Sequence, residues 1–381
     1  MTGYSTTDHL VIGGGPAGSM LAIRLAGAGR KVTLVEREPA AHHKVCGEFL
    51  SREATHYLRQ IGIDPLTLGA QIIDSVRLSS GNAMAAARLP FQALSLSRRT
   101  LDEALLARAG EAGAQMMRGV AVESLTSAGD EWLARLSNGE SLRASTIFLA
   151  TGKHDLRGLA RPAGRQNDLV GFKLHWQLAP AQINALRGYM DLYFFPGGYG
   201  GLSLIENDVA NLCLAVRRSS LRQGVWPQLL AAIVKENTHL RRLLRGAQTL
   251  WPRPLAISPI PYGYLAAEQH GPWRIGDQAA VIPSFTGDGI SIALHSGALA
   301  AEMVLAGESA SEFHRTLHRQ LRRPMALATF LSRAAVAFPG RTAAMRAVFV
   351  IPRAMRWIAD ATRIPKPAMV GEDAPGIAEG G

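Results

Sequence analysis

The feature that most constrains this chain is a glycine-rich turn close to its N-terminus. An apolar run at residues 10–12 leads into Gly13, Gly15 and Gly18, and an Ala- and Leu-rich stretch typical of a helix follows. Residues 31–36 then form a second, β-branched run. Strand, turn, helix and strand in this order predict a βαβ unit, and hence a parallel sheet covered by helices.

Each glycine of this turn meets a physical requirement of a phosphate-binding site. Gly13 permits the tight turn, Gly15 lets a pyrophosphate approach the backbone, and Gly18 lets the helix pack close to the strand. The helix that begins near Ser19, shortly after Ala17, presents free backbone N–H groups and the positive end of its dipole to the phosphates, and Ala17 is a candidate cofactor-binding residue. The turn therefore predicts a dinucleotide-binding site.

The acidic residue that ends the second strand supports the same interpretation. Glu36 is placed to accept hydrogen bonds from the hydroxyls of an adenosine ribose, and Arg37 follows it. An acid at this position suits FAD at least as well as NAD. The turn alone does not choose between the two dinucleotides.

A second glycine-rich segment lies far down the chain. Gly276 and Asp277 end an apolar run, and Gly287, Gly289 and Ile290 then open an Ala-rich, amphipathic stretch that predicts a helix. A helix that begins after glycines offers its N-terminus to negative charge, such as the charge that develops on a reduced flavin ring. Asp277 is a candidate to bind the ribityl hydroxyls.

Four motifs together resemble one superfamily of flavoproteins. They are GGGPAG…VERE at 13–38, KVCGEFLS at 44–51, RRTLD at 98–102 and GDQAAVIPSFTGDGISIALHSGALAAE at 276–302. In this combination they resemble the aromatic hydroxylases, flavin halogenases and geranylgeranyl reductases, which share a fold like that of para-hydroxybenzoate hydroxylase.

The resemblance implies a cofactor and positions for several residues. It implies FAD, with Arg98 beside the cofactor and Val120 near its adenine. The Cys-Gly segment resembles that of geranylgeranyl reductase-like members and implies that Cys46 and Glu48 lie near the isoalloxazine ring. There a thiol or carboxyl group can donate a proton. The alternative is that Cys46 is a small apolar filler beside Gly47.

The resemblance also implies an α/β fold (α+β overall) built from interleaved pieces. A dinucleotide-binding FAD domain, a substrate domain with an antiparallel sheet, a C-terminal helical segment and a loose tail are expected. They would use residues 1–72, 100–155 and 265–308 (FAD domain), 73–99 and 156–264 (substrate domain), 309–365 (helical segment) and 366–381 (tail). Within the substrate domain, residues 190–195 and 208–216 read as strands, and the stretch 196–201 predicts a turn.

Three functions are compatible with these motifs, and we favour the first over the two alternatives. The first is a monooxygenase (hydroxylase) or oxidase that acts on an apolar or aromatic small molecule of secondary or lipid metabolism, with NADPH or NADH as the electron donor. The second is an ene-reductase of the geranylgeranyl reductase type. The third is a non-catalytic FAD-binding protein that acts through a basic face.

Two departures from the family pattern bear on this choice. Hydroxylases of the group carry Asp-Gly after the strand that ends near Ala150, where this chain has Thr151, Gly152 and Lys153. That element contacts FAD and NADPH in the family, so its absence argues against direct use of NADPH and favours the reductase. The halogenase motif Trp-x-Trp-x-Ile-Pro is also missing.

Charge and composition limit the partners. Lysine and arginine number 41 against 30 acidic residues, which gives a net charge of +11. Basic residues between 311 and 363 alternate with apolar ones, as in a helical cap or in a face that contacts an anionic membrane surface or an acyl carrier. The substrate is expected to be carrier- or lipid-linked. Nucleic acid and a metal are not expected, and the oligomeric state is left open.

Cysteine usage bears on location. The two cysteines, Cys46 and Cys213, form no CxxC pair and no disulfide framework, which fits a reducing cytoplasm. No run of about 18 uninterrupted apolar residues exists. We therefore expect a cytoplasmic protein with surface contact to a membrane at most. His42, His43 and His175 are interpreted as loop or structural histidines.

Overall fold

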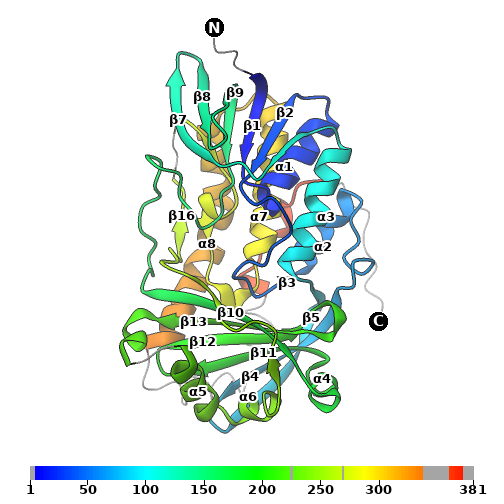
Figure 1. Cartoon of the computed structure of the whole chain (residues 1–381), viewed down its shortest axis with the longest axis vertical. Coiled ribbons are helices and arrows are strands. Elements are labelled where there is room, and N and C mark those ends of the chain that lie inside the picture. The colour runs from blue at the N-terminus through cyan, green and yellow to red at the C-terminus, as the bar shows by residue number, and fades with distance from the viewer. Residues whose placement is uncertain (1–4, 224–225, 268–269, 338–359, 372–381) are drawn as a thin grey trace.

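The computed structural model describes residues 5–223, 226–267, 270–337 and 360–371, and they fold around two sheets (Figure 1). The upper, seven-stranded sheet has the strand order β6-β2-β1-β9-β8-β7, and β17 also pairs with β9. Its strands are β1 (Ser5–Ile12), β2 (Val32–Glu36), β6 (Gln115–Arg118), β7 (Val122–Ala128), β8 (Glu131–Leu136), β9 (Ser141–Leu149) and β17 (Trp273–Arg274). The pairs of β1 with β2 and β9 are parallel, as the βαβ motif predicts.

Helices cover one face of this sheet and bring the two glycine-rich segments together. They are α1 (Pro16–Gly27), α2 (Arg52–Gln60), α3 (Arg98–Glu111), α7 (Gly289–Leu305) and α8 (Ala310–Ala337). A Cβ atom at Gly297 of α7 would collide with the backbone oxygen of Ala17, so the glycine allows α1 and α7 to pack in close contact. The start of α1 therefore packs against the middle of α7, and Gly276, from the late glycine-rich segment, lies between Ala17 of α1 and Ala293 of α7.

The lower, nine-stranded sheet has the order β14-β10-β13-β12-β11-β4-β5-β3, with β15 also paired to β10. Its strands are β3 (Phe49–Leu50), β4 (Gln71–Ser80), β5 (Ala83–Ser95), β10 (Leu169–Gln177), β11 (Gly188–Phe195), β12 (Gly198–Leu204), β13 (Ala210–Arg217), β14 (Gln248–Thr249) and β15 (Leu255–Ile257). Neighbouring strands are antiparallel except β4 and β11. The mixed α/β fold class is confirmed.

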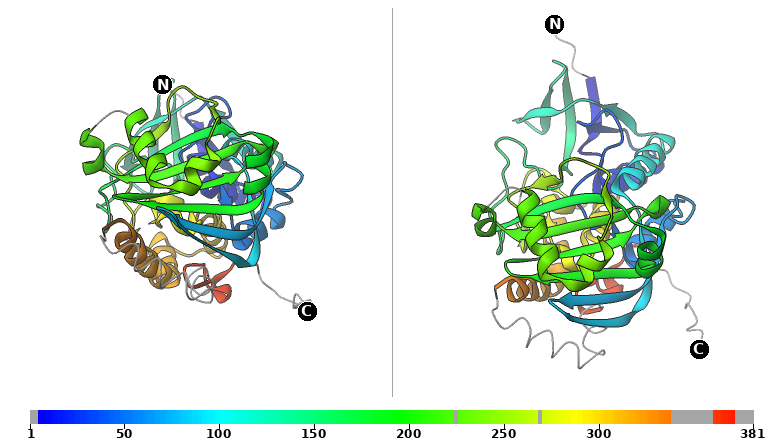
Figure 2. Two further views of the ribbon diagram at one scale, coloured as in Figure 1. Left: turned by 90° about the horizontal axis from the view of Figure 1, so that it is seen from below. Right: turned by 60° about the horizontal axis from the view of Figure 1, so that its bottom comes forward.

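Short helices lie on the outer face of the lower sheet, away from the upper sheet (Figure 2). They are α4 (Pro180–Leu186), α5 (Trp226–Glu236) and α6 (Thr238–Leu243), and they pack on an apolar cluster that includes Leu212 and Leu214. Two short strands, β16 (Tyr264–Leu265) and β18 (Ala280–Val281), pair with each other beside the upper sheet. Within the described residues, no helix is both long and apolar enough to span a bilayer.

The structure corrects two expectations for this part of the chain. The turn expected at 196–201 is shorter, because β12 already begins at Gly198. Cβ atoms at Gly198 and Gly200 would collide with Phe195 and Leu214, so these glycines serve close strand packing. The start of the tail expected to be loose is also packed, since Val370 is 5% exposed and its N–H donates to the Tyr57 hydroxyl.

The basic C-terminal region is described only in part. Residues 310–337 form one helix, α8, as the helical pattern of this region predicts. The arginines of 341–356 that contributed to this expectation lie outside the described residues. The boundaries of the interleaved domains stay a prediction. The structure does show β3, from the expected FAD domain, paired with β5 of the lower sheet.

Candidate functional site

The turn after β1 forms a cradle that suits a dinucleotide. Gly13 has a φ of +108°, and a Cβ atom there would collide with the backbone of Ala150. A Cβ atom at Gly18 would collide with the Gly13 oxygen, whereas Gly15 faces the cavity described below. A pyrophosphate needs open space beside the backbone, which Gly15 provides, and the N–H groups at a helix N-terminus, which the start of α1 provides. These residues therefore fit a dinucleotide cofactor.

Glu36 closes the cradle from the neighbouring strand. Its Oε2 atom accepts a hydrogen bond of 2.7 Å from the Gly14 N–H, and its Oε1 atom accepts one of 3.1 Å from the Glu38 N–H. The Glu36 side chain is 6% exposed and lines the cavity together with Arg37 and Val120. These contacts orient the carboxylate toward the position expected for a ribose.

Arg98 lies opposite the cradle, at the start of α3. Its Nε and Nη2 atoms donate to the two oxygens of Asp102 at 2.7 and 2.8 Å. Burial opposes the ionisation of Asp102, but Arg98 and then Lys44 outweigh it and hold the pKa of Asp102 below its usual value. The Arg98 Nη2 atom would lie 3.5 Å from a Cβ atom at Gly15, so a fixed cation borders the phosphate position.

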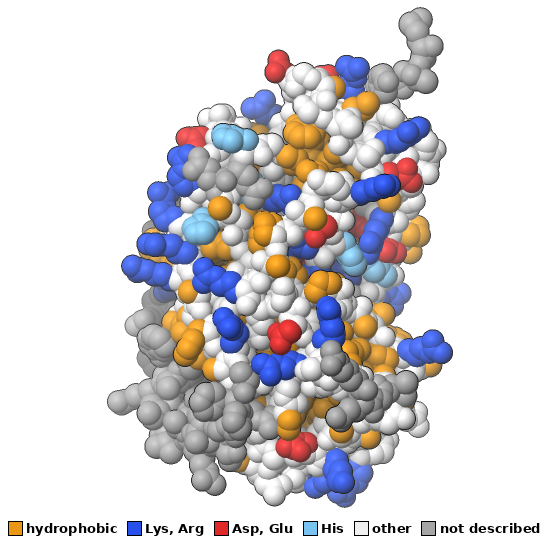
Figure 3. Space-filling view, turned by 90° about the vertical axis from the view of Figure 1, so that its left-hand side faces the viewer, with side chains coloured by type: hydrophobic (Ala, Val, Ile, Leu, Met, Phe, Trp, Pro, Cys, Tyr) orange, Lys and Arg blue, Asp and Glu red, His pale blue; other side chains and the backbone are white. Residues whose placement is uncertain are grey.

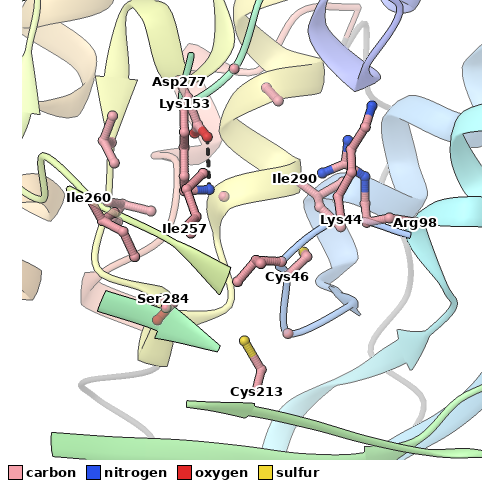
Figure 4. Close-up of a pocket in the computed structure, with 18 of the residues that line it drawn as sticks. Lys44, Cys46, Arg98, Lys153, Cys213, Ile257, Ile260, Asp277, Ser284 and Ile290 are labelled. Atoms are coloured by element: carbon pink, nitrogen blue, oxygen red, sulfur yellow. Dashed lines mark hydrogen bonds and ion pairs between the residues drawn. The ribbon is translucent and has the colours of Figure 1, made fainter. Parts of the chain in front are cut away.

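The late motif meets the same cavity from the side of α7. Gly276, Asp277, Gly287, Gly289 and Ile290 all line it. Lys153, which sequence reasoning did not place in the site, forms an ion pair of 3.0 Å with Asp277 (Figure 4). The ammonium group thus neutralises the acid that was expected to bind ribityl hydroxyls.

Asp288, between the two glycines that open α7, is buried and ion-paired. Its Oδ1 atom accepts a hydrogen bond of 2.5 Å from Arg363, a residue near the far end of the described chain. Burial raises the pKa of Asp288 to about 7, although Arg363 opposes this shift. No sequence pattern marks Arg363, because its partner lies 75 residues away.

A single large cavity connects these groups with the lower sheet. Its volume is about 1010 Å³, and it extends from the cradle to the inner face of the sheet. Beyond the cradle its walls are mainly apolar: Phe49, Val76, Leu78, Leu89, Met190, Leu192, Phe194, Leu255, Ile257, Ile260, Leu331, Ala334 and Ala335. This volume is at the upper end of the range for small-molecule sites, as expected for a cofactor together with a substrate.

Both cysteines contribute to the cavity wall between the cradle and the sheet (Figure 4). Cys46 lies on the loop before β3, where its sulfur accepts a hydrogen bond of 3.3 Å from the Glu48 N–H, and Asn211 donates to its backbone oxygen. Cys213 lies on β13. Burial raises the pKa of the Cys213 thiol to about 12, so this thiol stays protonated.

Glu48, the other catalytic candidate, is the centre of a buried ion cluster. Its carboxylate pairs with the Lys173 ammonium, accepts the Arg98 N–H at 2.7 Å and contacts His175 at 3.3 Å. Burial opposes the ionisation of Glu48, but Lys173 and His175 outweigh it and lower its pKa. An ionised carboxylate has no proton to give, which argues against Glu48 as a proton donor.

The same cluster contains three potential metal ligands. The ligand atoms of His43, Glu48 and His175 lie within 4.8 Å of one another. The Lys173 ammonium already neutralises the carboxylate of this group, and a cation would have to compete with it. Burial and then Lys173 lower the pKa of His43 to about 4. The arrangement is better explained as an ion cluster that fixes the Cys46 loop.

The structure thus brings together nearly all of the residues selected from the sequence. Gly18 is the exception: it packs inside the cradle and does not line the cavity. Lys153, Lys173 and Arg363 are the additions, and each is a single basic residue outside any motif.

Comparison with known proteins identifies an FAD binding domain in this chain. Residues 6–148 match the family model described as an FAD binding domain. The menaquinone reductase of Mycolicibacterium smegmatis is 26% identical over 79% of this chain and 76% of its own length. Digeranylgeranylglycerophospholipid reductase 2 of Methanosphaera stadtmanae is 25% identical over 77% and 76%.

Solved structures show the same fold. The myxobacterial chondrochloren halogenase CndH superposes with a TM-score of 0.74 at 20% identity, over 96% of this chain and 95% of its own. Together with the cradle, the cation beside it and the matching family model, these similarities confirm FAD as the cofactor. The chain is an FAD-dependent oxidoreductase whose residues 6–148 match the FAD binding domain family.

Proposed function

We propose that this protein is an FAD-dependent reductase that adds two hydrogen atoms across a carbon–carbon double bond of a long, apolar, lipid-linked substrate. The observation that carries the proposal is the apolar part of the cavity, which continues from the cradle along the inner face of the lower sheet to α8. An extended hydrocarbon chain buries its surface favourably against such walls. The two relatives described above are both named as reductases, and the name of one of them specifies a geranylgeranyl lipid.

Different parts of the site have different roles in the proposed reaction. Bound FAD supplies hydride transfer. The apolar walls would hold the substrate chain and exclude water, and in this proposal the Cys46 thiol, which lines the cavity, gives a proton to the second carbon. Asn211 and the Glu48 N–H fix the position of Cys46, and solvent returns the proton afterwards.

Product analysis separates this function from hydroxylation. FAD-loaded protein is reduced with dithionite without air and mixed with an unsaturated polyprenyl lipid, and the product is analysed by mass spectrometry. A reductase gives a product with two more hydrogen atoms and needs no oxygen. A product with one more oxygen atom, formed only after air is admitted, would contradict the proposal and support the monooxygenase.

The two cysteines provide a matched test of the proton donor. Cys46→Ala should slow substrate reduction by about a hundredfold or more, which is typical for the loss of a general acid. Cys213→Ala removes a thiol from the same cavity and should have little effect. FAD reduction by dithionite should be unchanged in both variants. Equal rates of substrate reduction in the two variants would rule out the role of Cys46.

A further inference from the structure

Helix α8 has two different faces that meet in its second half. One face closes the substrate cavity through Leu331, Ala334 and Ala335. The neighbouring face is exposed and basic. Its described residues follow a spacing of three or four positions and are Arg319, Arg322, Arg323, Ala326, Phe330 and Arg333. Such spacing places them along one side of a helix. We call this set the α8 stripe.

The composition of the α8 stripe is unusual for a solvated surface. Phe330 is 68% exposed, although an aromatic side chain is normally removed from water. Arg333 lies about one turn after it, and the other three arginines of the stripe lie about two to three turns before it on the same side of the helix. The only acid of α8 is Glu312, near the start of the helix. On the side of the molecule where α8 lies, Lys and Arg side chains clearly outnumber Asp and Glu, with hydrophobic side chains between them (Figure 3). The α8 stripe thus combines positive charge with an apolar anchor.

These two observations fit one kind of partner. An exposed aromatic ring on a stripe of arginines matches the boundary between lipid headgroups and acyl chains, where the ring enters the apolar layer and the cations face anionic headgroups. The end of this stripe, around Phe330 and Arg333, lies next to the residues of α8 that form a wall of the cavity in which we place the substrate chain. A membrane on the α8 stripe would therefore lie beside the cavity.

We infer that the α8 stripe docks this protein on an anionic membrane surface, so that a lipid-linked substrate passes from the bilayer along α8 into the cavity. The route of the substrate rests on the proposed function, whereas the membrane contact can be tested without it. Basic residues near an anionic surface each contribute to binding, and salt weakens this contribution.

The test is sedimentation of the FAD-loaded, full-length protein with phospholipid vesicles. One set is phosphatidylcholine alone, and the other contains about one third phosphatidylglycerol, which carries a negative charge. The unchanged protein should bind the anionic vesicles and be released by high salt. Arg322→Gln with Arg323→Gln should weaken this binding by about tenfold or more. Phe330→Ser should weaken it by about threefold or more.

A control pair removes the same charge elsewhere. Arg241 and Arg245 are exposed at α6 and the loop after it, on the outer side of the lower sheet. Arg241→Gln with Arg245→Gln should leave vesicle binding within about twofold of the unchanged protein. No binding to anionic vesicles, or equal losses in the two double variants, would overturn the inference.

Activity in detergent separates this inference from the proposed function. With a detergent-solubilised polyprenyl lipid, the Arg322/Arg323 variant should reduce the substrate as fast as the unchanged protein, and it should be slower only with substrate held in anionic vesicles. Activity in detergent without vesicle binding would overturn the docking surface alone. Vesicle binding without reduction of the lipid would overturn the proposed function and the substrate route, but not the docking surface.

Discussion

At the scale of the residue, the glycines of the cradle lack a side chain for two different reasons: one leaves space for the cofactor, and the others allow close packing. Gly15 faces the cavity, and a Cβ atom there would meet only the Arg98 guanidinium, at 3.5 Å. Gly13 and Gly18 are different, because Cβ atoms at those positions would collide with backbone atoms. A substitution at Gly15 therefore tests cofactor binding, whereas substitutions at the other two test the fold.

We expect Gly15→Val to lower FAD affinity by tenfold or more while the fold is retained, because the new side chain occupies the space expected for the pyrophosphate. Fluorescence titration of the FAD-free protein measures the affinity, and circular dichroism checks the fold. Gly27→Ala is the control, since a Cβ atom there has nothing within 4 Å. Unchanged affinity in Gly15→Val would place the cofactor elsewhere.

At the scale of the element, the Cys46 loop is fixed to the lower sheet by charge. Glu48 adopts a φ of +59°, which is uncommon for a residue with a side chain. Its carboxylate forms an ion pair with the Lys173 ammonium of β10, and both side chains are fully buried. Removing one member of such a pair leaves an uncompensated charge in the protein interior.

Lys173→Met should therefore lower the free energy of unfolding by about 3–5 kcal/mol. Adding Glu48→Gln to this variant should recover much of the loss, because the orphaned carboxylate is then neutral. Urea denaturation of the FAD-free proteins measures both effects. If the single variant loses less than about 1 kcal/mol, His175 or solvent compensates the carboxylate and the pair does not fix the loop.

At the scale of the whole molecule, the end of the described chain closes over the start of α7. Arg363 reaches the buried Asp288, whose pKa is raised from 3.8 to about 7. Arg363 and Glu53 are the charged groups that influence this carboxyl most strongly, with opposite effects. The pair links the C-terminal segment to the helix N-terminus at the cofactor site.

Burial of Asp288 makes stability depend on pH in a defined direction, because it raises the pKa of this carboxyl more than Arg363 lowers it. Because the folded-state pKa of Asp288 lies above the unfolded value, the folded state retains the proton, and stability falls as pH rises from about 4 to about 7. Asp288→Asn should remove this fall. The melting temperature of the variant should therefore rise relative to that of the unchanged protein as pH increases across this window. Melting temperatures of both proteins at several pH values test this. Parallel profiles would show that the carboxyl is ionised throughout.

Local patterns in the sequence determined the parts of the site whose partners are near in sequence. The βαβ motif predicted Gly13, Gly15, Gly18 and Glu36, and the structure arranges them as a cradle, because turn geometry and helix capping depend on adjacent residues. The late motif needed the family resemblance to join it to the first. The short turn at 196–197 was misjudged because strand glycines and turn glycines look alike until the neighbouring strand is known.

Only the tertiary structure decided which buried charges form ion pairs and which face of α8 lines the cavity. Many residues of sequence separate the two members of each buried ion pair, and no local pattern links them. The pairs are Lys173 with Glu48, Lys153 with Asp277, and Arg363 with Asp288. Their pairing follows from burial, since an isolated charge in the interior is too costly to persist. In the same way, the sequence predicted a basic helix near the C-terminus, but only packing shows that one face of α8 closes the cavity while the next faces solvent.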